Sequence, residues 1–280
     1  MKADARAAYA QALRWVVTGS SVYAENAKSI MNDWAQTLKR LKSTGIPRQV
    51  QLEAAWVAPI WAAAGEIIRH YDGGAAGWTA AEVEEFTRML QLYAYYARPS
   101  AVRPNNWGAS AALTLIAVAV FSDDRAMYNE GISSWKTVVA SSISLDGKPY
   151  EFEEREDCSH AQFSLLAFLQ AAEIAWHQGD DLYGYRVGQE QEPRLMKALE
   201  HSARLFLGID SFPLSNGGTK SCDGKMFAGY EYAYNHYKFR AQVPSQSISS
   251  FEAALLEVRP DDIYKFFLGW SSLSHGALSE

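Results

Sequence analysis

The sequence predicts an all-α protein built of antiparallel helix pairs. Apolar residues recur at helical spacing through most of the 280 residues, and short breaks rich in Gly, Pro and Asp separate the segments. Hydrophobic residues make up 48% and charged residues 21%, which is typical of a soluble globular protein with a large core. Helix pairs with short connections favour hairpins curled into an α/α toroid or a solenoid. Because no linker interrupts the pattern, we expect residues 1–280 to form a single domain.

Helical segments follow one another through the first half of the chain. Thr79, with Glu82 three residues later, predicts a capping box at the start of the fourth segment. Asn106 can cap the fifth segment because its amide accepts a hydrogen bond, whereas Ala109 cannot. The apolar run at 111–121 is too short for a membrane span, so we expect a buried helix and no membrane partner. The expected helices span about 4–17, 22–41, 52–71, 79–97, 106–121 and 124–140.

The second half of the sequence is less regular. Segment 141–156 breaks the helical rhythm, with a turn at Asp146-Gly147. Segment 215–224 is rich in Gly, Ser and Asn and predicts a loop, and an aromatic-rich stretch follows at 230–239. Helices are expected at 157–178, 192–207 and 263–273.

Composition limits the class of partner. The net charge of −6 argues against nucleic acid, because phosphate binding needs concentrated Lys and Arg. A local basic cleft could still bind an anionic sugar. Nine Trp and fifteen Tyr offer flat apolar faces with a polar handle, which suit sugar rings, although large helical cores also use aromatic residues.

The two cysteines, Cys158 and Cys222, are not in CxxC spacing, which argues against a zinc or redox motif. The acidic and histidine residues near Asp157 and His160 have no metal-ligand spacing either. We therefore expect no metal and no cofactor. Whether the two cysteines form a disulfide stays open. No signal peptide is visible after Met1.

Three segments carry polar side chains that a helical scaffold does not need. The first is Asn105-Asn106-Trp107-Gly108, at a junction between a loop and a helix. One interpretation is simple helix capping by an asparagine. The other is a site that donates amide hydrogen bonds beside an aromatic ring.

The second segment runs from the acidic stretch 153–157 to His160 and Gln162. The acidic residues suit the dipole of the following helix and need no function. His160 lies on the first turn of a helix whose later positions are apolar, so we expect it to point inward with Gln162 nearby. It is either a satisfied core residue or a catalytic group.

The third segment, 230–240, combines four tyrosines with His236, Lys238 and Arg240. It follows a Gly-rich loop that could act as a flap or a rim. Packing alone explains this density of polar rings and cations poorly, and a tyrosine-lined interface is the alternative interpretation.

Taken together, these segments resemble the motifs of the alginate-lyase family. Asn105-Asn106-Trp107-Gly108 is similar to the family's asparagine motif. Two further signatures are similar to segment 157–183, which carries His160 and Gln162, and to Tyr234-Asn235-His236-Tyr237 with Arg240 and Pro244 after it. The motifs stand in the family's order, and the resemblance covers residues 8–275.

The resemblance implies an all-α toroid, an incomplete barrel because the N-terminal part looks short, and a carbon–oxygen lyase that is secreted or periplasmic. Trp107 stands where the best-known alginate lyases have a histidine, and Phe163 where they have a catalytic tyrosine. The chain is therefore more similar to the branch that includes glucuronan- and alginate-cleaving lyases. The missing tyrosine would come from the cluster at 230–237, with Tyr234 favoured before Tyr237.

The implied reaction is β-elimination in a 1,4-linked polyuronate, either glucuronan or alginate (polymannuronate), which leaves a 4,5-unsaturated uronic acid end. The enzyme must stabilise an enolate-like charge, remove the C5 proton and protonate the leaving oxygen. Neighbouring cations at His236, Lys238 and Arg240 would lower a phenol pKa. The expected catalytic residues are Asn106, His160, Tyr234, Tyr237 and Arg240. The expected substrate-binding residues are Asn105, Trp107, Arg155, Gln162, Tyr230, Tyr232 and His236.

Two other functions stay open. A glycoside hydrolase on the same fold needs two opposed carboxylates, which Glu231 with Asp157 or Glu156 could supply. A non-catalytic protein that binds acidic glycans would keep the aromatic rings but tolerate the loss of His160. The sequence does not predict the oligomeric state.

Overall fold

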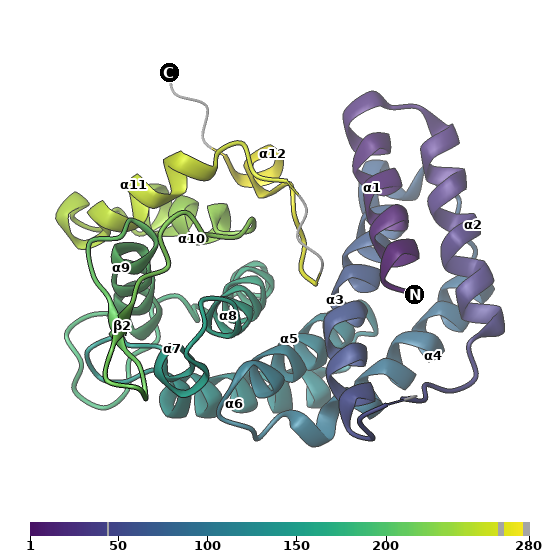
Figure 1. Ribbon diagram of the computed structural model, residues 1–280. Helices are drawn as coiled ribbons and strands as arrows, with labels where there is room; N and C mark the ends of the chain where they lie inside the picture. Colours follow the sequence, from purple (N-terminus) through teal and green to yellow (C-terminus); the bar gives the residue numbers. More distant parts are fainter. Residues whose placement is uncertain (44, 263–265, 277–280) are drawn as a thin grey trace. The chain divides into compact units, whose positions relative to one another are not determined.

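The computed structural model describes residues 1–43, 45–262 and 266–276, and helices dominate this part of the chain (Figure 1). The chain divides into two compact units. Unit 1 comprises Met1–Ala101 and Ala111–Ile132, and unit 2 comprises Val102–Ser110 and the described part of Ser133–Glu280. The single domain expected over residues 1–280 stays a prediction.

Unit 1 is built from long helices that pack in antiparallel pairs, as the sequence predicts. Helix α1 packs against α2 and α3, and α4 packs against the same two helices. The predicted capping box is present at the start of α4, where Thr79 and Glu82 exchange hydrogen bonds. The elements are α1 Lys2–Thr18, α2 Ser21–Thr37, α3 Gln49–His70, η1 Tyr71–Gly74, α4 Ala80–Ala97 and η2 Arg98–Ser100.

Helices α5 (Asn106–Phe121) and α6 (Arg125–Ser142) contribute residues to both units. The helices of unit 2 are α7 Tyr150–Arg155, α8 His160–His177, α9 Arg194–Phe206, α10 Glu231–Asn235, η3 His236–Arg240, η4 Ser245–Ile248, α11 Ser249–Val258 and α12 Ser271–His275. Strands β1 (Phe212–Pro213) and β2 (Thr219–Lys220) form a short antiparallel hairpin. Across the described ranges, no helix is both long and apolar enough to cross a bilayer.

Helix α8 is buried along most of its length, and α7 and α10 pack against it (Figure 1). From α6, the indole Nε1 of Trp135 donates a hydrogen bond to the carbonyl of Phe168, 3.1 Å away. The two cysteines do pair: a disulfide joins Cys158, just before α8, to Cys222, just after β2. Helix α8 is thus held by neighbours on several sides and provides a rigid support for the residues at its ends.

Several boundaries differ from the sequence prediction. Segment 141–156 contains helix α7, which Pro149 precedes and which carries Glu151 and Glu153 in its first turn, where acidic residues suit the helix dipole. The predicted loop 215–224 contains β2. Of the helix predicted at 263–273, residues 263–265 lie outside the described residues, and the described part is helical only from Ser271.

Candidate active site

The residues selected from the sequence gather at two places, one at each end of α8. His160 begins this helix, and Glu173, the partner of Arg240, lies near its end. At about 1.5 Å of rise per residue, the two positions are about 20 Å apart along the helix. The structure therefore does not bring His160 and Arg240 into one site, although both belong to unit 2.

At the N-terminal end of α8, Asp157 and His160 form a hydrogen-bonded pair. Asp157 Oδ2 lies 2.6 Å from His160 Nδ1, while Oδ1 accepts the backbone N–H groups of Ser159 and His160 at 2.7 and 2.9 Å. Burial opposes ionisation of Asp157, but these hydrogen bonds outweigh it and hold the pKa of Asp157 below its usual value. An ionised carboxylate only accepts, so Nδ1 carries a hydrogen, and in the neutral imidazole the lone pair is then on Nε2.

His160 is half-buried, with 30% of its side chain exposed, rather than fully turned inward as expected. Its ring packs edge-on against Phe163, with centroids 5.6 Å apart. From the sequence, Asp157 was expected to compensate the helix dipole or to serve as a hydrolase carboxylate, and not to pair with His160. An Asp three residues before a His can bond to the backbone N–H groups at the helix start and so lie beside the imidazole, and this local pattern could have indicated the pair.

The asparagine motif lies at the first turn of α5. Asn105, and not Asn106 as predicted, caps the helix: its Oδ1 accepts the Trp107 N–H at 3.0 Å. Asn106 is only 2% exposed, and its side-chain amide has no hydrogen-bond partner in the described part of the chain. The ring of Trp107 stacks with the guanidinium of Arg103, 4.4 Å from its centroid. Capping by Asn105 thus leaves the side-chain amide of Asn106 without a hydrogen-bond partner among the described residues.

Glu151 of α7 connects this motif to α8, and sequence analysis missed it. Glu151 Oε1 accepts the backbone N–H of Asn106 at 3.0 Å, and Oε2 accepts the hydroxyl of Ser164. Ser164 lies one turn after His160, so the first turn of α5 is held beside the first turns of α8. Burial raises the pKa of Glu151 to about 7. Within an acidic stretch of sequence, nothing distinguishes this one buried carboxyl from its exposed neighbours.

Gln162 and Arg155 were both expected to bind substrate, and they differ in how far protein contacts occupy their polar groups. The amide of Gln162 donates to the carbonyls of Cys158 and Lys225 at 2.7 and 2.8 Å and accepts the N–H of Phe227 at 2.8 Å. It also accepts the hydroxyl of Tyr230 at 3.4 Å, so it ties the 225–230 loop to α8. Arg155 is exposed at the end of α7 and makes no ion pair with any described residue.

At the other end of α8, Glu173 receives several charged or polar partners. The guanidinium of Arg240 donates to both carboxylate oxygens at 2.9 Å, and Nε2 of His275 lies 3.2 Å from Oε1. The hydroxyl of Tyr183 donates to Oε2 at 3.0 Å. Burial opposes ionisation, but hydrogen bonds from His275 and Arg240 lower the pKa of Glu173 to about 2. Arg240 is therefore held in an internal ion pair.

The expected catalytic tyrosines direct their hydroxyls into protein contacts. Tyr234 donates to Glu252 Oε1 at 2.5 Å, and burial together with this bond raises the pKa of Tyr234 to about 12. Tyr237 donates to the carbonyl of Tyr183 at 3.0 Å, and burial raises the pKa of Tyr237 well above its usual value. Burial likewise raises the pKa of Tyr230.

The expectation that neighbouring cations lower a phenol pKa is wrong for this cluster. Lys238 and Arg240 are both paired with carboxylates, Lys238 with Glu252 at 3.3 Å and Arg240 with Glu173. His236 is buried against the ring of Tyr183, and burial lowers the pKa of His236. Paired or neutral groups offer a phenolate no net positive charge. Tyr232, also expected to bind substrate, is buried with its ring 4.5 Å from that of His275.

The family model of alginate lyases matches residues 1–208, about three quarters of the chain. The chain belongs to the alginate lyase family. No curated protein sequence matches it. Membership places this lyase in a family of enzymes that act on polysaccharides, and the predicted glucuronan branch stays a prediction.

Solved alginate lyase structures are similar to this chain over most or nearly all of its length. Alginate lyase A1-III from Sphingomonas species A1 has 17% identity and a TM-score of 0.67, over 85% of this chain and 69% of that one. A Tyr-to-Phe variant of alginate lyase A1-III in complex with a tetrasaccharide has 16% identity and a TM-score of 0.71, over 99% and 76%. An alginate lyase from Bacteroides ovatus has 15% identity and a TM-score of 0.65, over 99% and 73%. The predicted fold class, the all-α toroid class, is confirmed by these matches.

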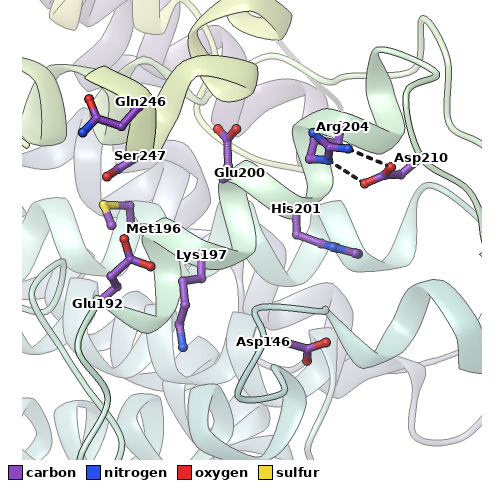
Figure 2. A pocket seen from close by; sticks show the side chains of 10 residues that line it. All are labelled: Asp146, Glu192, Met196, Lys197, Glu200, His201, Arg204, Asp210, Gln246 and Ser247. Carbon is purple, nitrogen blue, oxygen red and sulfur yellow. Dashed lines mark hydrogen bonds and ion pairs between the residues drawn. The ribbon is translucent and has the colours of Figure 1, made fainter. Parts of the chain in front are cut away.

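The lyase chain also has a separate hollow of about 530 Å³ over α9, outside both groups of selected residues (Figure 2). Its lining residues are Asp146, Glu192, Met196, Lys197, Glu200, His201, Arg204, Asp210, Gln246 and Ser247. Its charged side chains are largely occupied: Arg204 forms a two-point ion pair with Asp210, and Glu200 accepts two backbone N–H groups at the start of α11. Among the described residues, no group of three His, Cys, Asp or Glu side chains could hold a metal ion.

Proposed function

We propose that this chain cleaves a 1,4-linked polyuronate, glucuronan or alginate (polymannuronate), by β-elimination. The observation that carries the proposal is the Asp157–His160 pair on a helix that Glu151 links to Asn106, in a chain of the alginate lyase family. The buried side-chain amide of Asn106 has no hydrogen-bond partner among the described residues. The product would carry a 4,5-unsaturated uronic acid at its new end.

Elimination begins with a weakly acidic C5 proton. The adjacent carboxylate must accept more charge as the proton leaves, and preorganised donors lower the cost of that charge. The amide of Asn106 can donate to one carboxylate oxygen, and the exposed guanidinium of Arg155 can supply positive charge.

His160 is the proposed base. Asp157 holds Nδ1, so the lone pair of Nε2 can take the C5 proton. When the C5 proton and the C4 oxygen lie on one face of the sugar, the resulting imidazolium can return the proton to the leaving oxygen. This assignment replaces Tyr234 and Tyr237, whose phenols have raised pKa values and engaged hydroxyls.

The structure argues against the glycoside hydrolase alternative, because Glu231, one of its two proposed carboxylates, is enclosed in the protein. Glu231 is fully buried and receives both Nε and Nη2 of Arg259, at 2.5 and 2.7 Å. A general acid or base must reach the substrate, and this carboxylate cannot while it is enclosed in an ion pair.

We further propose a secreted or periplasmic location. The disulfide between Cys158 and Cys222 supports it, because such bonds persist in oxidising compartments and are rare in reducing ones.

The test is incubation of the protein with glucuronan, polymannuronate and mixed alginate while ultraviolet absorbance is recorded. Elimination creates a C4–C5 double bond that absorbs, whereas hydrolysis creates reducing ends without absorbance. A rise with at least one polymer that is absent from a His160→Ala control supports the proposal. New reducing ends without absorbance, or no cleavage of any polyuronate, would contradict it.

A further inference from the structure

Among the described residues, Glu151 is the one buried carboxyl that contacts the proposed site and has no role in the proposed chemistry. It is 2% exposed and lies in the first turn of α7. Its two oxygens bind two different helices, the N–H of Asn106 in α5 and the hydroxyl of Ser164 in α8. A single side chain thus connects the element that carries the proposed donor with the element that carries the proposed base.

We propose that Glu151 is a positioning residue for the elimination, and that it holds Asn106 in place as an uncharged acid when the polyanionic substrate is bound. The inference rests on the proposed function. Asn106 itself would touch the substrate carboxylate, and Glu151 would act only through Asn106.

Burial of Glu151 favours its neutral form and outweighs the hydrogen bonds from Ser164 and Asn106, which favour the charged form. The hydrogen-bond partners of the carboxyl are neutral, and no described cation lies within ion-pair distance of it. The charged groups that act on it, Arg155 and Glu154, are both on α7 and oppose each other. Helix α8 presents only the Ser164 hydroxyl, and the neighbouring β1 packs the ring of Phe212 against α7. A buried carboxylate without a cation is costly, so burial favours protonation.

Substrate binding adds to this preference. The carboxyl of Glu151 contacts the backbone N–H of Asn106, so a uronate carboxylate bound by the side-chain amide of the same residue would repel an ionised Glu151. The raised pKa of Glu151, about 7, means that the free enzyme ionises this group close to neutral pH. Affinity for the polyuronate should therefore fall as Glu151 becomes charged.

The matched variants are Glu151→Gln, Glu151→Ala and Ser164→Ala. Glutamine keeps both contacts without a charge, because its carbonyl can accept from Asn106 and its amide can donate to Ser164. Glu151→Ala removes both contacts, and Ser164→Ala removes one contact with little loss of volume. The folded state of each is checked by circular dichroism.

The measurement is the pH dependence of KM and kcat between pH 6 and 9 on the best polyuronate. Wild type should show a KM that rises at least about threefold above pH 7, and Glu151→Gln should lose this rise while kcat stays within about threefold of wild type. Glu151→Ala should lose about tenfold or more in kcat, the scale of a misplaced catalytic group, and Ser164→Ala should fall between.

The outcomes separate the two proposals. A wild type that cleaves no polyuronate overturns the proposed function. If the wild type is active and Glu151→Gln shows the same pH dependence of KM, the proposed role of Glu151 as a neutral acid is overturned. Should Glu151→Ala fail to fold, Ser164→Ala decides the positioning role, which is overturned if its kcat matches wild type.

Discussion

Asp157 Oδ2 lies 2.6 Å from Nδ1 of His160, while the other oxygen of the same carboxylate holds the backbone at the start of α8. One side chain therefore sets both the helix start and the orientation of the imidazole. Because Asp157 accepts at Nδ1, the lone pair of the neutral imidazole is on Nε2, the atom proposed as the base.

His160→Ala should cut turnover by at least ~100-fold, the scale for loss of a proton-transferring group. Its ring is half-buried and has no other hydrogen-bonding role in the described part of the chain, so the fold should change little. Steady-state elimination rates and circular dichroism are measured together. Near-normal turnover of a folded variant would remove His160 from the mechanism.

Asp157→Asn should lower turnover by at least ~10-fold, because an amide can stabilise the wrong tautomer of His160 and cannot stabilise the imidazolium. Asparagine still accepts the backbone N–H groups at the helix start, so stability should fall little. Nitrogen-15 chemical shifts of the imidazole report the tautomer. An unchanged tautomer with unchanged turnover would show that Asp157 only caps the helix.

Asn106→Ala and Asn105→Ala form a matched pair. Asn106→Ala should lose most activity with little change in stability, since its side-chain amide has no described partner. Asn105→Ala should cost ~1 kcal/mol of unfolding free energy, the usual worth of an N-cap, and largely spare kcat. Urea unfolding and elimination rates measure both quantities. Loss of activity in Asn105→Ala, with a loss of stability only in Asn106→Ala, would assign the functional role to Asn105.

Tyr234→Phe and Tyr237→Phe should remain active lyases. Their hydroxyls bond to Glu252 and to the carbonyl of Tyr183, so each variant should lose ~1 kcal/mol of stability instead. Loss of nearly all elimination by a folded variant that still binds polymer would restore a tyrosine as the proton-transfer group.

Protonation of Glu173 in acid should lower the free energy of unfolding. Its pKa is about 2 in the folded state against an ordinary value of 4.5, so its stabilisation is present above pH 4.5 and is lost as pH falls towards 2. Glu173→Gln should flatten the fall in unfolding free energy between pH 5 and 3. An unchanged slope would mean that the ion pair with Arg240 contributes nothing to folding.

Helix order and the order of the motifs could be predicted from the sequence because both depend on local information. Apolar spacing and the Thr79–Glu82 box predict the long helices, and the break before His160 predicts a polar helix start. Helix α7 escaped prediction because an acidic hexapeptide has too little apolar periodicity to show its buried face.

The sequence by itself determined the helical class, the family and the segments that bear polar side chains. Only the tertiary structure decided which of those side chains meet. The polar residues at 230–240 suggested a site, yet the hydroxyls of Tyr234 and Tyr237 and the guanidinium of Arg240 are engaged in internal contacts. Glu173, the partner of Arg240, lies about 20 Å along α8 from His160. Glu151 and Asn106, 45 residues apart, are in contact. Burial and long-range pairing are properties of the packed chain, and they set both the pKa values and the free hydrogen-bonding groups on which the proposed chemistry depends.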